Sequence, residues 1–202
     1  MSLFKKIFGS TKNDDGKKQV SDHRSKYMPE VKLPVDEKFT INFKNNGGKF
    51  IYCDSLDEIT EGFSNILAEN EWKESQVFCL DELLSKKFSN LNVIYSKKNH
   101  KNAAFFTTCE YLVADNGSIL INSFQIKENK LNELPDNFIV FATTSQLVDT
   151  ISEGLRGIKK KHKDKIPTNI TTIKHFEIKD EKDFMTYGSS SKNLYLLLLE
   201  DL

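Results

Sequence analysis

The feature of this sequence that most restricts its fold is the repeated alternation of short β-rich runs with amphipathic helical segments. After residue 35, apolar runs rich in β-branched and aromatic residues alternate with stretches of helical periodicity, and only a few residues connect them. Such short connections are typical of βαβ units, which place their strands in parallel. The sequence therefore predicts an α/β protein with a mostly parallel sheet.

The first half of the chain predicts three helices and three strands. One of these helices carries the clearest signal, because Ser55 and Glu58 form a capping box ahead of an apolar stripe that ends near Asn70. Gly47 and Gly48 end the helix before it. The expected helices are 36–46, 55–70 and 81–88, and the expected strands are 49–53, 76–80 and 91–95.

The second half begins with two β-rich runs, 110–114 and 118–121, which are separated by Asp115, Asn116 and Gly117. Asn-Gly between such runs is a strong hairpin signal, because both residues tolerate positive φ. We therefore expect an antiparallel hairpin to interrupt the parallel sheet.

The remaining elements are two further strands and a long helix ahead of a final strand. A strand over 137–142 leads into residues 143–145, whose hydroxyls can cap a helix expected over 145–161. A strand follows at 169–173. The run of apolar residues at 194–199 predicts a last strand that is covered on both faces.

The length of 202 residues fits one compact domain. Residues 10–34 contain few apolar side chains and many charges, a composition that cannot repay the entropy of ordering. We therefore expect a flexible N-terminal arm over 1–34 and a folded domain over 35–202. The apolar residues of 3–8 allow two interpretations, a frayed segment or a short helix that contacts a partner or a membrane surface.

The net charge of the chain and the length of its apolar runs restrict which partners and which cellular compartment we expect. Lys+Arg and Asp+Glu both number 29, so no global charge favours nucleic acid or an anionic membrane. The lysine run 159–163 is interpreted as a solvated helix end. No apolar run reaches the length of a membrane helix, and the start lacks the features of a signal peptide, so we expect a cytoplasmic protein without a membrane span.

The cysteines and histidines indicate neither a metal site nor a disulfide. Cys53, Cys79 and Cys109 are odd in number and lie in separate apolar runs, so we interpret them as reduced core thiols. The four histidines lack the spacing by which a helix presents metal ligands. We expect no metal and no cofactor.

Four segments in the second half carry a family resemblance. They are ADNGSIL at 114–120, LP at 134–135, FIVFATTSQLVDTISEGL at 138–155 and YGSSSKNLYLLLLED at 187–201. In order and spacing the chain resembles the lactate-utilisation (LUD) domain family of the LutC/YkgG type, whereas its first half agrees only in the alternation of strands and helices. The chain departs from the family at 171–176, where a stretch rich in Gly, Ser and Pro is expected.

The resemblance implies a three-layer α/β/α fold similar to the NagB/RpiA/CoA-transferase group. It also implies a role as a non-redox component of L-lactate oxidation to pyruvate, with iron–sulfur clusters on companion subunits. Two alternatives remain open. One is a stand-alone enzyme of the CoA-transferase or sugar-phosphate isomerase type with Asp115 as nucleophile or base, and the other is a degenerate LUD fold that serves only as an interaction module.

The candidate site consists of three loops that are expected to converge at one sheet edge, outside the carboxyl ends of the strands. Hydroxyls and free amides at a helix N-terminus suit a small anion such as lactate, pyruvate or a phosphorylated compound. Each loop also has a structural interpretation, as a hairpin turn, a helix cap or a flexible connector. Besides Asp115, the candidate ligand-binding residues are Asn116, Gly117, Ser118, Thr143, Thr144, Ser145, Gly188, Ser189, Ser190 and Lys192.

Overall fold

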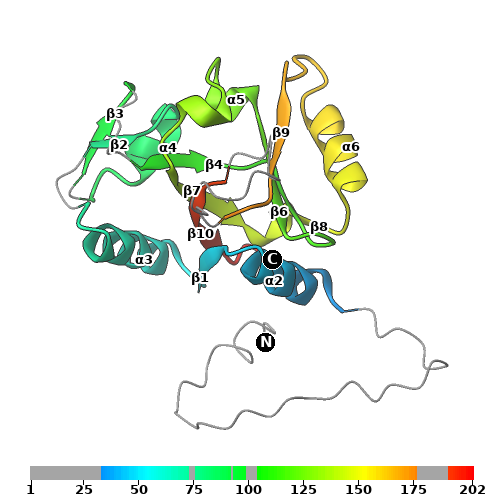
Figure 1. The fold of residues 1–202 in the computed structure, drawn as a ribbon, viewed down its shortest axis with the longest axis horizontal. Helices are drawn as coiled ribbons and strands as arrows, with labels where there is room; N and C mark the ends of the chain where they lie inside the picture. The colour runs from blue at the N-terminus through cyan, green and yellow to red at the C-terminus, as the bar shows by residue number, and fades with distance from the viewer. Residues whose placement is uncertain (1–32, 73–75, 92, 99–103, 177–190) are drawn as a thin grey trace, which may run out of the picture. The chain divides into compact units, whose positions relative to one another are not determined.

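The computed structural model describes residues 33–72, 76–91, 93–98, 104–176 and 191–202 (Figure 1). The part of the chain from Pro34 to Leu202 forms one compact unit. None of the helices in these ranges is long and apolar enough to cross a membrane. The expected arm over 1–34 lies almost entirely outside the described residues, so that boundary stays a prediction.

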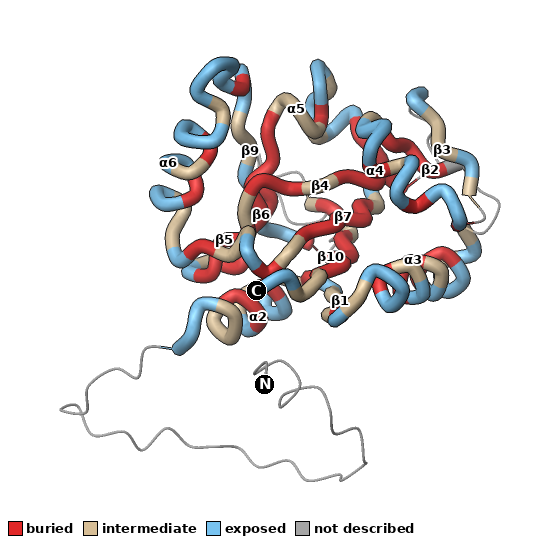
Figure 2. Tube along the Cα trace, turned by 180° about the vertical axis from the view of Figure 1, so that it is seen from behind, coloured by how far each residue is buried: buried red, intermediate tan, exposed pale blue. Residues whose placement is uncertain are grey.

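The centre of the fold is a six-stranded sheet, which we call sheet A. Every pair of neighbouring strands in it is parallel, as the alternation of helices and strands predicted. Because the central strands are buried on both sides (Figure 2), sheet A forms the middle layer. Its strands, in spatial order, are β1 (Lys49–Cys53), β10 (Asn193–Leu199), β7 (Asn137–Thr143), β4 (Phe105–Thr108), β2 (Gln76–Phe78) and β3 (Ile94–Ser96).

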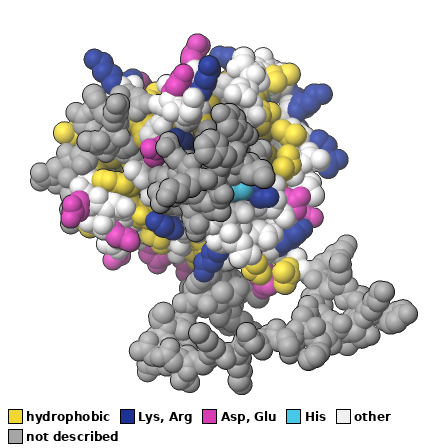
Figure 3. Space-filling view, viewed as in Figure 1, with side chains coloured by type: hydrophobic (Ala, Val, Ile, Leu, Met, Phe, Trp, Pro, Cys, Tyr) yellow, Lys and Arg dark blue, Asp and Glu magenta, His cyan; other side chains and the backbone are white. Residues whose placement is uncertain are grey.

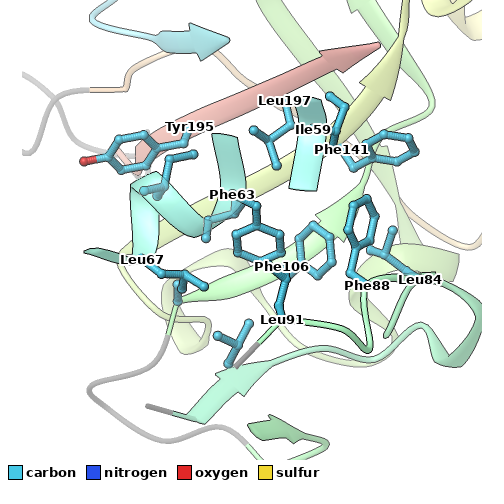
Figure 4. Close-up of a cluster of buried hydrophobic side chains, with 14 of the residues drawn as sticks. Ile59, Phe63, Leu67, Leu84, Phe88, Leu91, Phe106, Phe141, Tyr195 and Leu197 are labelled. Carbon is cyan, nitrogen blue, oxygen red and sulfur yellow. The ribbon is translucent and has the colours of Figure 1, made fainter. Parts of the chain in front are cut away.

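Helices α3 (Leu56–Glu69) and α4 (Glu82–Lys87) cover one face of sheet A. Helix α3 begins as predicted, with the Ser55 hydroxyl accepting a hydrogen bond from the Glu58 amide at 3.2 Å. Its apolar side packs into a cluster of aromatic and aliphatic side chains (Figure 4), in which the Phe63 and Phe106 ring centroids lie 4.6 Å apart. This cluster is the main core on that face.

Helix α2 (Val35–Asn45) lies on the opposite face. Its Phe43 contacts Phe50 of β1, whereas Gly62 of α3 lies against Ile51, and neighbouring residues of a strand point to opposite faces. Connections between parallel strands are right-handed, so the direction of a connection across the sheet decides which face it covers. The connections from β1 to β2 and from β2 to β3 run in one direction and cover one face. Those from β4 to β7 and from β7 to β10 run in the opposite direction and cover the other face. The expected three-layer α/β/α fold class is confirmed.

The second side also carries a four-stranded sheet, sheet B. Strands β5 and β6 form the predicted antiparallel hairpin, in which Val113 pairs with Ser118. The hairpin does not interrupt the parallel sheet, however, because β5 pairs with β8 and β6 with β9. That part of the prediction was wrong. Sheet B, in spatial order, comprises β8 (Leu147–Val148), β5 (Tyr111–Val113), β6 (Ser118–Asn122) and β9 (Ile170–Ile173).

The helix expected over 145–161 is shorter than predicted. Helix α6 spans Ile151–Lys161, and the Thr150 hydroxyl caps it by accepting a hydrogen bond from the Glu153 amide at 3.2 Å. The residues before it form a 3-10 turn, Thr144–Gln146, and the extended strand β8. Pairing of β8 with β5 holds this segment out of the helix.

The three cysteines are buried and free, which confirms their interpretation as core thiols. Burial raises the pKa of Cys53 and of Cys79 to about 11, and that of Cys109 still further above its ordinary value. All three thiols are therefore protonated and weakly reactive at neutral pH.

Candidate functional site at the carboxyl edge of sheet A

Three segments meet at the edge of sheet A where its parallel strands end. Residues 109–110 follow β4, the turn Thr144–Gln146 follows β7, and residues 200–201 follow β10. Strands β4, β7 and β10 are neighbours, so these segments lie side by side. This carboxyl edge is where open α/β sheets bind their ligands.

Asp201 occupies the donors that were predicted to hold an external anion. The Ser145 amide donates to Asp201 Oδ1 at 2.8 Å, the Ser145 hydroxyl donates to Oδ2 at 2.7 Å, and the Thr144 hydroxyl donates to Oδ1 at 3.0 Å. Burial alone would raise the pKa of Asp201, but these hydrogen bonds outweigh it and lower the pKa below its ordinary value. An external anion at this turn would have to displace the chain's own carboxylate.

Glu110 forms a second carboxylate network at the same edge. The residue is only 3% exposed, yet four side chains contact its carboxylate. Asn122 Nδ2 and Gln125 Nε2 donate to Oε1 at 2.9 and 2.8 Å, His162 Nε2 lies 3.2 Å from Oε1, and Lys161 Nζ lies 3.0 Å from Oε2. Burial opposes the ionised form, but these partners reverse its effect and lower the pKa of Glu110. The chain thus keeps a charged carboxylate in its interior.

A local capping box fixes two of the donors to Glu110. In the helix α5 (Ser123–Ile126), the Asn122 side-chain oxygen accepts from the Phe124 amide at 2.7 Å, and Gln125 Oε1 accepts from the Asn122 amide at 2.7 Å. Both side-chain oxygens are therefore occupied, which leaves both NH₂ groups for the carboxylate. The same reasoning places a proton on Nε2 of His162, because the ionised Glu110 can only accept.

Gln146 connects the two networks. Its Oε1 accepts from the Thr143 amide at 2.8 Å, and its Nε2 donates to the Cys109 carbonyl at 2.6 Å and to the Glu110 carbonyl at 3.2 Å. The end of β7 is thereby tied to the end of β4. Glu110 and Gln146 were not predicted from the sequence, although a lone acid inside the apolar run 109–114 is a visible signal for Glu110.

The turn of the hairpin is docked on α2. Asn42 Nδ2 donates to the Ala114 carbonyl at 2.8 Å, and Asn46 Nδ2 donates to the Asn116 carbonyl at 2.7 Å. Within the turn, Asn116 Oδ1 accepts from the amide and the hydroxyl of Ser118 at 3.1 and 2.7 Å. These contacts favour the interpretation as a structural turn. Asp115 is exposed at its tip, and its role as a nucleophile or base stays a prediction.

Replacing Gly117 should destabilise the protein because no other residue fits its position. Its φ is +63°, and a Cβ there would lie 2.3 Å from the backbone carbon of Asn42. We expect Gly117→Ala to lower the free energy of unfolding by about 2–3 kcal/mol, measured by urea denaturation. Gly62→Ala is the control, since its Cβ would come no closer than 3.3 Å to a side chain and the change should cost under about 1 kcal/mol. Equal effects of the two changes would contradict the docking of the turn on α2.

Lys192 does not reach the carboxyl edge. It precedes β10, whereas residues 143–145 lie at the end of β7, and the two strands are parallel. Its side chain is 2% exposed, and Nζ donates to the Leu134 carbonyl at 3.0 Å and lies 3.4 Å from Asp136 Oδ1. Burial lowers the pKa of this amine. The predicted convergence of three loops was therefore wrong for Lys192, and Gly188, Ser189 and Ser190 lie outside the described residues.

The stretch that departs from the family pattern forms part of a strand. Ile170–Ile173 is β9, which pairs with β6, and Phe176 beyond it is buried against Phe43. His175 is exposed. Among the described residues, no group of three or more His, Cys, Asp or Glu side chains could hold a metal ion.

The fold and its carboxyl edge place this chain among the three-layer α/β/α proteins, and a solved structure shares its fold. The crystal structure of a DUF162 family protein from Deinococcus radiodurans is similar to 83% of this chain and 96% of that chain, with a TM-score of 0.57 and 14% sequence identity. No curated protein shows significant similarity. A model of the LUD domain matches residues 37–199, so the chain belongs to the LUD domain family, which associates it with lactate utilisation at the level of the family.

Proposed function

We propose that the chain is a non-redox component of an L-lactate utilisation system of the LutC/YkgG type, in the cytoplasm. The observation that carries this proposal is the LUD domain match, which spans nearly all of the described unit. Companion subunits would carry the iron–sulfur clusters and the electrons. This chain would complete the assembly without turning over lactate by itself.

The positions of the cysteines support this division of labour. An iron–sulfur cluster needs several thiolates grouped around it. Cys53 ends β1, Cys79 follows β2 and Cys109 follows β4, and β1 is separated from the other two strands within sheet A. Their buried, protonated thiols suit core packing better than metal ligation.

The donors at the carboxyl edge are already occupied, which favours a role as an assembly component over a role as an enzyme. Asp201 holds the donors at the end of β7, and Asp115 is exposed on a turn whose neighbours dock on α2. The enzyme alternative finds its best support in the contact between Glu110 and His162, since a carboxylate can orient an imidazole for proton transfer. Acyl exchange or sugar-phosphate isomerisation by the purified chain, lost in Asp115→Asn or Glu110→Gln, would favour that alternative.

Growth of a deletion strain tests the proposed role in the cell. We expect the strain to lose growth on L-lactate as sole carbon source and to grow normally on pyruvate, because only the oxidation step lacks its component. The wild-type chain supplied in trans should restore growth. Normal growth of the deletion strain on L-lactate would refute the proposal.

A further inference from the structure

A strongly basic segment lies at the end of α6 in a chain whose total charge is balanced. Residues 156–165 contain six cationic side chains and a single acid, Asp164. Lys and Arg side chains gather along this side of the molecule in Figure 3. We call the six exposed cations the basic surface: Arg156, Lys159, Lys160, Lys161, Lys163 and Lys165.

The segment that carries the basic surface is anchored to the core beneath it. Ile158 is buried on sheet B, and Lys161 and His162 bind the carboxylate of Glu110. Lys165 lies over the Phe124 ring, 5.9 Å from its centroid. The buried carboxylate therefore anchors the end of α6, from which the neighbouring lysines project into solvent.

Stabilisation of the fold does not explain why all six cations are clustered here. Cations in the last turn of α6 are favoured by the helix dipole, but Arg156 lies a turn earlier and Lys163 lies beyond the helix. Within the described part of the chain, the side chains of Arg156, Lys159, Lys160 and Lys163 form no hydrogen bond or ion pair.

The chemistry of the surface fits an acidic protein better than nucleic acid or membrane. Residues 151–170 contain no Phe, Tyr or Trp, and the nearby Phe124 ring is already covered by His162 and Lys165, so no row of aromatic rings is available for bases to stack on. The apolar side of α6 faces sheet B, so it is not free to enter a bilayer. Leu155 and Ile166 are 41% and 61% exposed at the two ends of the basic run, and such apolar anchors beside charges are typical of protein interfaces.

We propose, on the basis of the assembly role above, that the basic surface docks an acidic face of a companion subunit. Complementary charges would set the orientation of the two proteins and speed their association. Leu155 and Ile166 would contribute the apolar contacts. The buried Glu110 would serve this interface indirectly, because it holds the end of α6 in place.

Affinity purification from lactate-grown cells tests the surface with matched variants of the full chain. The double variant Lys160→Glu/Lys163→Glu changes the net charge by the same amount as a control double variant, Lys86→Glu/Lys98→Glu. The two control lysines are exposed and lie in α4 and just after β3, outside the basic surface. Circular dichroism would verify that both variants are folded. We expect the wild type and the second variant to recover the same iron-containing protein at low salt, and the first variant to recover at least about tenfold less of it.

The possible results distinguish a failure of the proposed docking surface from a failure of the proposed assembly role. Equal recovery with both variants would overturn the basic surface as the docking site and leave the assembly role intact. Failure of the wild type to recover any iron-containing protein would overturn both. Loss of recovery after nuclease treatment, or binding of the wild type to phosphatidylserine vesicles in place of a protein, would also refute the proposed acidic protein partner.

Discussion

Replacement of Glu110 by Ala should lower the free energy of unfolding by about 2–4 kcal/mol at neutral pH. The change leaves the buried donors of Asn122 and Gln125 without their acceptor and removes the anion that offsets Lys161. A buried group that loses its partner keeps the full cost of its desolvation. Urea denaturation followed by circular dichroism measures the difference.

Two controls separate the buried network from an ordinary surface ion pair. Lys161→Ala should cost only about 1 kcal/mol, because the lysine side chain is 57% exposed and Glu110 keeps its other three partners. Glu128→Ala removes an exposed carboxylate and should have almost no effect. If Glu110→Ala costs no more than Lys161→Ala, the network does not stabilise the fold.

The contribution of Glu110 to the free energy of unfolding should decrease as the pH is lowered. Its pKa is lowered in the folded state, so its contribution is present above the ordinary glutamate pKa of about 4.3 and is lost as the pH falls through the folded value. The stability difference between the wild type and Glu110→Gln should therefore shrink in acid. A difference that stays constant from neutral pH to acid would contradict an ionised Glu110.

Elements with strong local signals were predictable from the sequence. Helix α3 begins and ends where its capping box and apolar stripe indicated, because both depend on residues within a few positions of each other. Strand β8 was mistaken for helix, since Leu147 and Val148 also fit a helical stripe. Their pairing with β5, more than 30 residues earlier in the chain, decides the structure, and no local pattern encodes that pairing.

The candidate site was less predictable, for two different reasons. Ser145 binds Asp201 and Glu110 binds His162 across more than 50 residues, so neither contact leaves a local pattern. The error at Lys192 was avoidable. A residue that precedes a strand of a parallel sheet lies at the opposite edge from residues that follow a strand, and the sequence predicts the last strand at 194–199, after Lys192.

The carboxyl edge and the basic surface fit one functional interpretation. The donors at the carboxyl edge are used by Asp201 and Glu110, which strengthen the fold there. Glu110 also anchors α6, whose exposed basic surface is available to a partner. A component that completes an assembly needs a rigid fold and a docking surface, and it needs no redox centre of its own.

Restoration of lactate oxidation in a cell extract tests this central claim most directly. The extract comes from the deletion strain, L-lactate is the substrate, and reduction of an added dye reports its oxidation to pyruvate. We predict that the purified chain alone reduces no dye, and that its addition to the extract restores the rate to that of a wild-type extract. The account is contradicted if the purified chain oxidises lactate by itself, or if the deletion extract is fully active and does not respond to the added chain.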